Sequence, residues 1–138
     1  MIWFDALLEE EPLPHALERA LCVLLGCTRD AFDIVDDLTA LHAGLDAFCL
    51  QRRMAGGAFA TMITLYAQPA KFDAARCLDI VDAAAILAHA LGVRVLIADD
   101  ATSNPYAFIL IAGSGERARV QVDASALDER DSIVMLDR

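Results

Sequence analysis

The sequence lacks the motifs by which most enzymes and metal proteins are recognised. Its three histidines, His15, His42 and His89, are scattered, and no HxxxH, HExxH or Cys/His cluster is present, so a zinc site is not expected. None of the few serines sits in a GxSxG nucleophile elbow. The Gly-Ser-Gly segment at 113–115 lies between two predicted strands, so it predicts a turn and not a phosphate-binding loop. We therefore expect no catalytic residues, no cofactor and no bound metal.

Acidic pairs are the one remaining source of chemistry. Two groups of carboxylates could bind a divalent ion: Asp33, Asp36 and Asp37, or Asp99 with Asp100. Neither group has the length or the periodicity of a calcium loop. Solvated acids at the ends of loops are the alternative, and we favour it. A small enzyme or a ligand-binding domain of unknown substrate is therefore the third choice of function.

The cysteines and the uncharged segments exclude further classes. Cys22, Cys27, Cys49 and Cys77 show no CxxC spacing and lie in apolar segments, which is typical of buried free thiols in a reducing cytosol. The first residues contain no basic segment of the kind that begins a signal peptide. The uncharged run 54–70 contains glycine, glutamine and proline and lacks the sustained apolar character of a membrane span. We expect a cytoplasmic protein that does not associate with membranes.

The charge is strongly of one sign. The formal net charge is −10, with 21 acidic and 11 basic side chains. Such a chain repels phosphate backbones, which argues against nucleic acid as a partner. It suits a basic protein partner instead, because complementary fields speed the encounter of two proteins. The alternative is that the charge only keeps an apolar domain soluble, since 57% of the residues are hydrophobic.

The strongest structural signal runs from residue 72 to residue 98. Apolar residues recur at spacings of three and four, the period of a buried helical face: Leu78, Ile80, Val81, Ala84, Ala85, Leu87, Ala88 and Leu91. Gly92 follows the last of them, where glycine most easily takes the left-handed conformation that ends a helix. The pattern predicts a long central helix from about Asp73 to Leu91, followed by a strand over 93–98.

The half before this helix predicts helices and then a strand group. Residues 2–8 predict a short amphipathic helix or an arm, and 13–25 predict a second helix that ends at Gly26. A short strand is expected within 30–37, and a turn or helical link over 38–45. Two strands, 47–53 and 58–68, are expected to form a hairpin whose tight turn contains Gly56 and Gly57.

The half after the helix predicts a second strand group. Strands are expected over 106–112 and 117–123, a short helical or looped link over 124–131, and a last strand over 133–136. Strands that follow one another through tight turns form antiparallel pairs. The sequence therefore predicts one α+β domain over 1–138, with a mainly antiparallel sheet packed against the long central helix and the N-terminal helices.

One loop has the composition of a protein-binding edge. Asp99, Asp100, Asn104 and Tyr106 combine negative charge, a turn-forming segment and a large amphipathic ring. We predict these four residues as the first partner-binding candidates. An ordinary hairpin loop is the alternative interpretation. The second candidates are the acids of the expected first strand of the sheet: Asp33, Asp36 and Asp37.

The last third of the chain resembles a known class of proteins. Between Gly92 and Leu136 the sequence reads Gly-Val-Arg-Val-Leu-Ile-Ala-Asp-Asp, then Ser-Asn-Pro-Tyr, Phe-Ile-Leu-Ile, Val-Gln-Val-Asp and Leu-Asp-Glu-Arg-Asp. This pattern resembles the immunity proteins encoded beside bacterial polymorphic toxins of the Rhs and type VI secretion kind. The resemblance implies a cytoplasmic inhibitor that neutralises a cognate toxin by occluding it.

A second resemblance competes with the first. A small acidic chain with an N-terminal helix, three strands and then a long helix is similar to type III secretion chaperones. That resemblance implies a homodimer that holds an effector. The second half departs from the pattern, because the chain continues after the long helix into several strands and is expected to end on one, over 133–136, where the chaperone fold closes with a helix.

Overall fold

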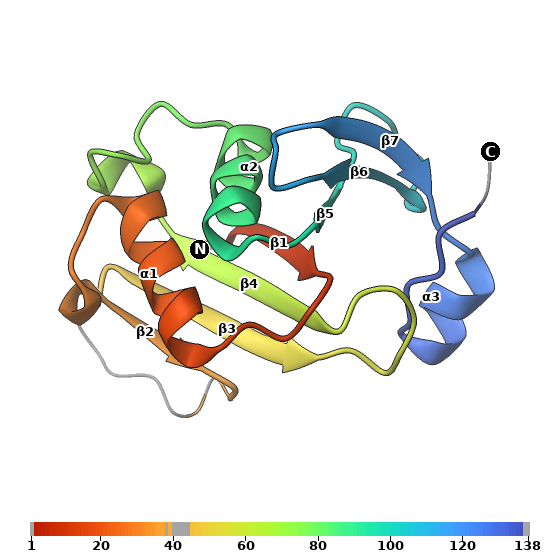
Figure 1. Ribbon diagram of the computed structural model, residues 1–138, viewed down its shortest axis with the longest axis horizontal. Coiled ribbons are helices and arrows are strands. Elements are labelled where there is room, and N and C mark those ends of the chain that lie inside the picture. Colours follow the sequence, from red (N-terminus) through yellow and green to blue (C-terminus); the bar gives the residue numbers. More distant parts are fainter. Residues whose placement is uncertain (1, 38, 40–44, 137–138) are drawn as a thin grey trace.

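The computed structural model describes residues 2–37, 39 and 45–136. Within them the chain forms one seven-stranded sheet and three α-helices, which confirms an α+β fold (Figure 1). The strands are β1 (Ile2–Leu8), β2 (Phe32–Val35), β3 (Ala47–Arg53), β4 (Thr61–Ala67), β5 (Val95–Ala98), β6 (Ala107–Ile111) and β7 (Arg117–Gln121). The helices are α1 (Pro14–Leu25), α2 (Ile80–Leu91) and α3 (Ala124–Arg130), with 3-10 turns η1 (Arg29–Ala31) and η3 (Pro69–Lys71).

The sheet is mixed but mainly antiparallel. Its order is β2-β3-β4-β1-β5-β6-β7, and only the β2–β3 pair is parallel among the described strands. The predicted helix over 13–25 and the predicted strands around 30–37, 47–53 and 58–68 are confirmed, with boundaries shifted by a few residues. Most of the turn or link predicted over 38–45 lies outside the described residues.

The N-terminal segment is a central strand, so its prediction as a helix or an arm was wrong. β1 pairs with β4 on one side, from Ile2 opposite Tyr66 to Leu8 opposite Thr61, and with β5 on the other. Its apolar residues lie on both faces of the sheet, as in a strand covered on both sides. A short run of this kind fits helical spacing equally well, and only pairing with distant segments decides between them.

Helix α2 is shorter than predicted. It begins at Ile80 and ends at Leu91, so it has 12 residues, and the expected start near Asp73 was wrong. Asp79 fixes the start, because its carboxylate accepts the backbone N–H of Asp82 at 2.7 Å. Gly92 takes the expected left-handed conformation, with φ at 67°.

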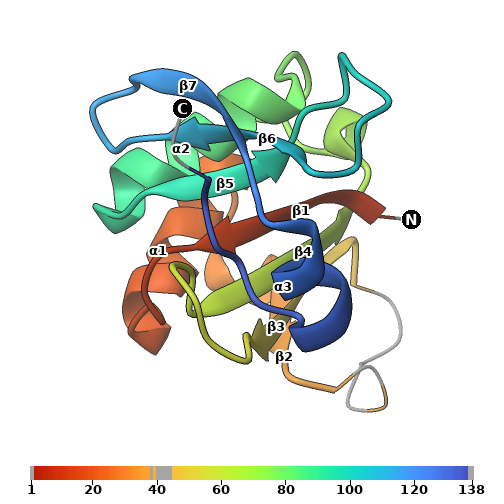
Figure 2. The same ribbon diagram turned by 90° about the vertical axis from the view of Figure 1, so that its right-hand side faces the viewer.

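Two clusters of buried side chains cover the two faces of the sheet. The larger one lies under α1 and α2, which pack side by side (Figure 1), and includes Leu21 and Leu87 at 0% exposure. The smaller one joins Leu7 and Leu96, on the other face, to α3 and the segment after it. Figure 2 shows α3 and this segment in front of the strands.

The last described segment differs from its prediction. Residues 133–136 make only isolated bridges, between Gly57 and Ile133 and between Val122 and Met135. The β3–β4 hairpin is closed by a loop over 54–60, so the predicted tight turn was wrong. Gly57 has φ at 86°, and a Cβ there would lie 2.3 Å from the carbonyl oxygen of Ile133. The loop over 54–60 therefore packs closely against the C-terminal segment, and this contact requires glycine at position 57.

Candidate functional site

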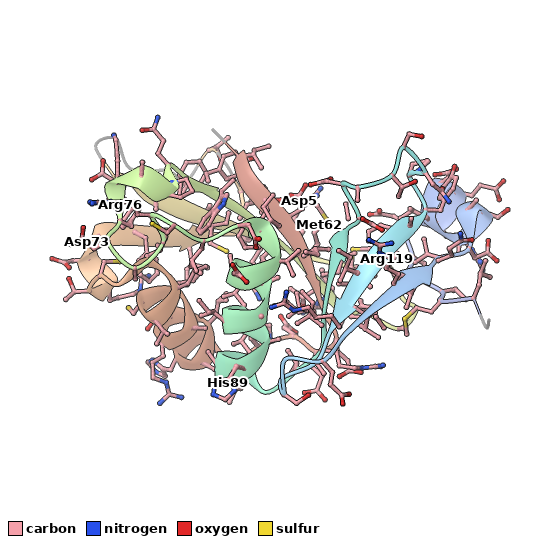
Figure 3. The ribbon with its side chains drawn as sticks, turned by 90° about the horizontal axis from the view of Figure 1, so that it is seen from above. Asp5, Met62, Asp73, Arg76, His89 and Arg119 are labelled. Atoms are coloured by element: carbon pink, nitrogen blue, oxygen red, sulfur yellow. The ribbon has the colours of Figure 1, made fainter. Side chains whose placement is uncertain are left out.

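The sheet opens between two of its central strands. β1 and β5 pair only at Leu7 with Leu96 and at Leu8 with Val95. β1 continues to Ile2 and β5 continues to Ala98, but no residue of one strand lies opposite the other there. Figure 3 shows the resulting opening, with Asp5 and Met62 labelled beside it. The two strands thus form the walls of a cleft.

The cleft has a volume of about 440 Å³ and a mainly apolar lining. β1 contributes one wall and β5 the other, while Phe108 of β6, Leu127 of α3 and Met62 of β4 complete the sides. The full set of lining residues is Ile2, Trp3, Phe4, Asp5, Leu7, Met54, Met62, Ile80, Leu96, Ile97, Ala98, Asp100, Phe108, Leu127, Asp131 and Ile133. This size and lining are typical of binding pockets, which combine apolar walls with a few polar groups.

The charged side chains among the described residues that line the cleft are all carboxylates. Asp5, Asp100 and Asp131 are exposed, and no Lys, Arg or His is found among the described residues that line it. None of the three carboxylates takes part in an ion pair within the described chain. The cleft therefore attracts cations and repels anions.

Asp5 is held in place by the neighbouring strand. Thr64 lies opposite it on β4, is 4% exposed, and donates its hydroxyl hydrogen to Asp5 Oδ1 at 2.5 Å. A hydrogen bond to a charged acceptor is stronger than one between neutral groups. This contact orients one carboxylate oxygen and leaves the exposed side of Asp5 for another partner.

The peptide groups of the walls also face the cleft. Ala60 donates its N–H to the carbonyl of Leu8, and Glu9 donates to that of Arg94. Because backbone groups alternate in direction along a strand, even-numbered residues of β1 face β4 and odd-numbered ones face β5. The N–H and C=O of Asp5 thus point away from β4, and the same alternation directs those of Ala98 towards β1.

Of the four residues predicted first as partner contacts, one lines this cleft and the other three stabilise the loop that follows β5. Asp100 lines the cleft. Asp99 does not present its charge freely: it is 7% exposed, accepts the N–H of Ala101 at 3.1 Å and lies 3.6 Å from Nε of Arg119. Its carboxylate holds the loop that follows β5, which is a structural role.

Asn104 and Tyr106 also stabilise the loop. The amide oxygen of Asn104 accepts the N–H of Tyr106 at 3.0 Å. The hydroxyl of Tyr106 donates to Asp128 Oδ2 at 2.5 Å, and this hydrogen bond raises the pKa of Tyr106 above its usual value. Tyr106 therefore ties the β5–β6 connection to α3, which forms one side of the cleft.

The second candidates lie elsewhere in the fold. β2 is the strand at the far edge of the sheet, four strand positions from β5, or about 19 Å at 4.8 Å per strand. Asp33 Oδ1 accepts the N–H of Ile34 at 3.0 Å. Asp37 accepts the N–H of Thr39 at 2.9 Å, which lowers the pKa of Asp37. Asp36 is exposed. The two predicted groups thus do not form one acidic surface.

Sequence reasoning missed Asp5 and Asp131 of the cleft, together with Thr64, which supports Asp5. Asp5 was visible as the single charge inside the apolar run over 2–8. With that run read as a helix or an arm, a charged residue was unremarkable. In a central strand it becomes a carboxylate on a largely apolar sheet face, which signals a site.

The other groups capable of chemistry are separate. Among the described residues no three His, Cys, Asp or Glu side chains gather as a metal site would require. All four cysteines are free; Cys49 is buried and Cys77 exposed, so the expectation of buried thiols holds only in part. Burial raises the pKa of the Cys49 thiol to about 12.

Within the described chain, no helix has the length and apolarity needed to cross a bilayer.

Comparison of the chain with family models, with curated proteins and with solved structures finds no match in any of the three.

Proposed function

We propose that this protein binds a basic partner protein and neutralises it by occluding its surface, as an immunity protein does with its toxin. The observation that carries the proposal is the cleft between β1 and β5. Its described lining is mainly apolar and holds three carboxylates that form no ion pair within the described residues, with no cationic side chain among them. The net charge of −10 supports it as well. A partner with clustered Lys and Arg side chains complements this surface.

Two physical effects contribute to binding in different ways. The apolar walls supply affinity, because burying their surface on association is favourable. The carboxylates supply encounter rate and selectivity for cations, since charged rims act mainly on association. A basic toxin that acts on nucleotides or nucleic acid, in the compartment of this inhibitor, is the proposed target.

The test uses the purified product of the adjacent gene as the partner. We expect it to associate with this protein faster at low salt than at high salt, and to lose its activity in the complex. The double variant D5N/D100N should slow association about threefold to tenfold and reduce the salt dependence. D36N/D37N removes the same charge at the far edge of the sheet and is the matched control. Equal rates for the two double variants would contradict the role of the cleft.

A second function is favoured by one observation. Two departures from the chaperone pattern were expected, several strands after the long helix and a final strand. β5, β6 and β7 match the first departure, but after α3 the described chain makes only isolated bridges. After β1, the order is helix, three strands, helix, three strands, helix. A chaperone would bind a secreted effector as a homodimer. Light scattering of the complex distinguishes the two functions, since a chaperone predicts two copies of this chain per partner and an inhibitor one.

A further inference from the structure

We infer that the occupant of the cleft is an extended segment of the partner, which adds to β1 as a strand and places a Lys or Arg side chain beside Asp5. The inference rests on the proposed function and specifies how the partner is recognised. It depends on a feature of the backbone: β1 and β5 pair at one end and separate towards the other.

The backbone of the walls is suited to strand addition. Asp5 lies in a regular stretch of β1 whose pairing with β4 is continuous from Phe4 to Leu8. Its N–H and C=O point towards β5, yet β5 has no residue opposite it. Such groups are those that an added strand pairs with in β-augmentation. On β5, Ala98 has the same position relative to β1.

The side chains of the walls specify the character of the segment. An extended peptide projects alternate side chains to opposite faces. Leu7, Leu96 and Met62 offer apolar contacts on one face of the sheet, and Phe4 and Ile97 on the other. Asp5 and Asp100 are exposed carboxylates of the lining. A segment of alternating apolar and basic residues matches this pattern.

A second copy of this chain is a poor occupant, because two chains with a net charge of −10 repel each other. A cationic small molecule would satisfy the carboxylates and the apolar walls but would leave the peptide groups of β1 unpaired. Strand addition alone therefore makes the binding depend on N–H and C=O groups of the ligand backbone.

The test measures binding of a fluorescently labelled, end-blocked eight-residue peptide of alternating Lys and Val by anisotropy, and follows it in amide NMR spectra. Two matched peptides serve as controls: one with Glu in place of Lys, and one N-methylated at alternate residues, which keeps every side chain but removes donors. We expect the Lys peptide to bind, D5N to weaken it about threefold to tenfold, and the Asp5 amide to become protected from hydrogen exchange. D36N should leave the affinity unchanged.

The outcomes separate this inference from the proposed function. Equal binding of the N-methylated peptide, or an Asp5 amide that stays unprotected, overturns strand addition even when the whole partner binds and is inhibited. Equal binding of the Glu peptide overturns the recognition of a basic side chain. Binding of the Lys peptide that needs both Asp5 and a free backbone supports the inference, even when the product of the adjacent gene does not bind.

Discussion

Two buried threonines on β4 provide a sharp test of the structure. Thr61 is 1% exposed, and within the described chain its Oγ1 has no hydrogen-bond partner. Thr64 is 4% exposed, and its hydroxyl donates to Asp5. Replacing each by valine keeps the side-chain shape and the β-propensity and removes only the hydroxyl. The two variants are therefore expected to change stability in opposite directions.

The magnitudes follow from the two environments. A buried hydroxyl without a partner costs about 1–3 kcal/mol, so Thr61→Val should stabilise the fold by about 1–2 kcal/mol. Thr64→Val loses a hydrogen bond to a charged acceptor, a class worth about 1.5–3 kcal/mol. Asp5 is exposed enough to recover hydration, so the net loss is about 1 kcal/mol. At about 3 °C per kcal/mol for a domain of this size, the melting temperatures of the two variants should differ by about 6–9 °C.

Urea unfolding at neutral pH is the assay. An unchanged slope of the unfolding free energy against urea concentration shows that the folded and the unfolded state keep their compactness. Thr64→Val should also bind the basic partner more weakly, since Asp5 loses the contact that orients it, whereas Thr61→Val should bind as the wild type does. A Thr61→Val protein less stable than the wild type would refute the assignment of an unsatisfied hydroxyl.

Three further predictions concern the core and its charges. Leu87→Asp places a charge at a position with 0% exposure and should unfold the domain; a cooperative thermal transition like that of the wild type would contradict this. Cys77 should react with a thiol reagent in the native protein, whereas Cys49, whose pKa is raised to about 12 by burial, should react only after unfolding, as mass spectrometry can show. The hydrogen bond from Arg94 lowers the pKa of Glu9 below its ordinary 4.5, so Glu9→Gln should lose stability above pH 4.5, and urea unfolding should show this loss vanishing as the pH falls through the lowered pKa.

Local signals predicted much of the fold. α1 follows from helical spacing that ends at Gly26. The β3–β4 and β6–β7 hairpins follow from pairs of strand-forming segments separated by glycine-containing segments, although the connection between β3 and β4 is longer than the predicted tight turn. β1 was missed because its partners are distant in sequence, as in the pairing of Ile2 with Tyr66. The early start assigned to α2 had another cause, since apolar spacing does not reveal which residue caps the helix, here Asp79.

The site was only partly predictable for the same reason. Asp100 was identified from loop composition, and it lines the cleft. The opening between β1 and β5 is a property of strand pairing, which no local pattern records. Asp99 and Tyr106 were chosen for their chemical type, but their contacts with Arg119 and Asp128 use that chemistry inside the protein.

The most direct test of the account is hydrogen exchange of this protein alone and in complex with the purified product of the adjacent gene. We predict that the complex slows exchange in β1 around Asp5, in the segment from Ala98 to Asp100 and at the end of α3, and leaves β2 unchanged. Protection confined to β2 and its flanking acids Asp36 and Asp37, with β1 exchanging as in the free protein, would contradict the claim that the cleft is the binding site.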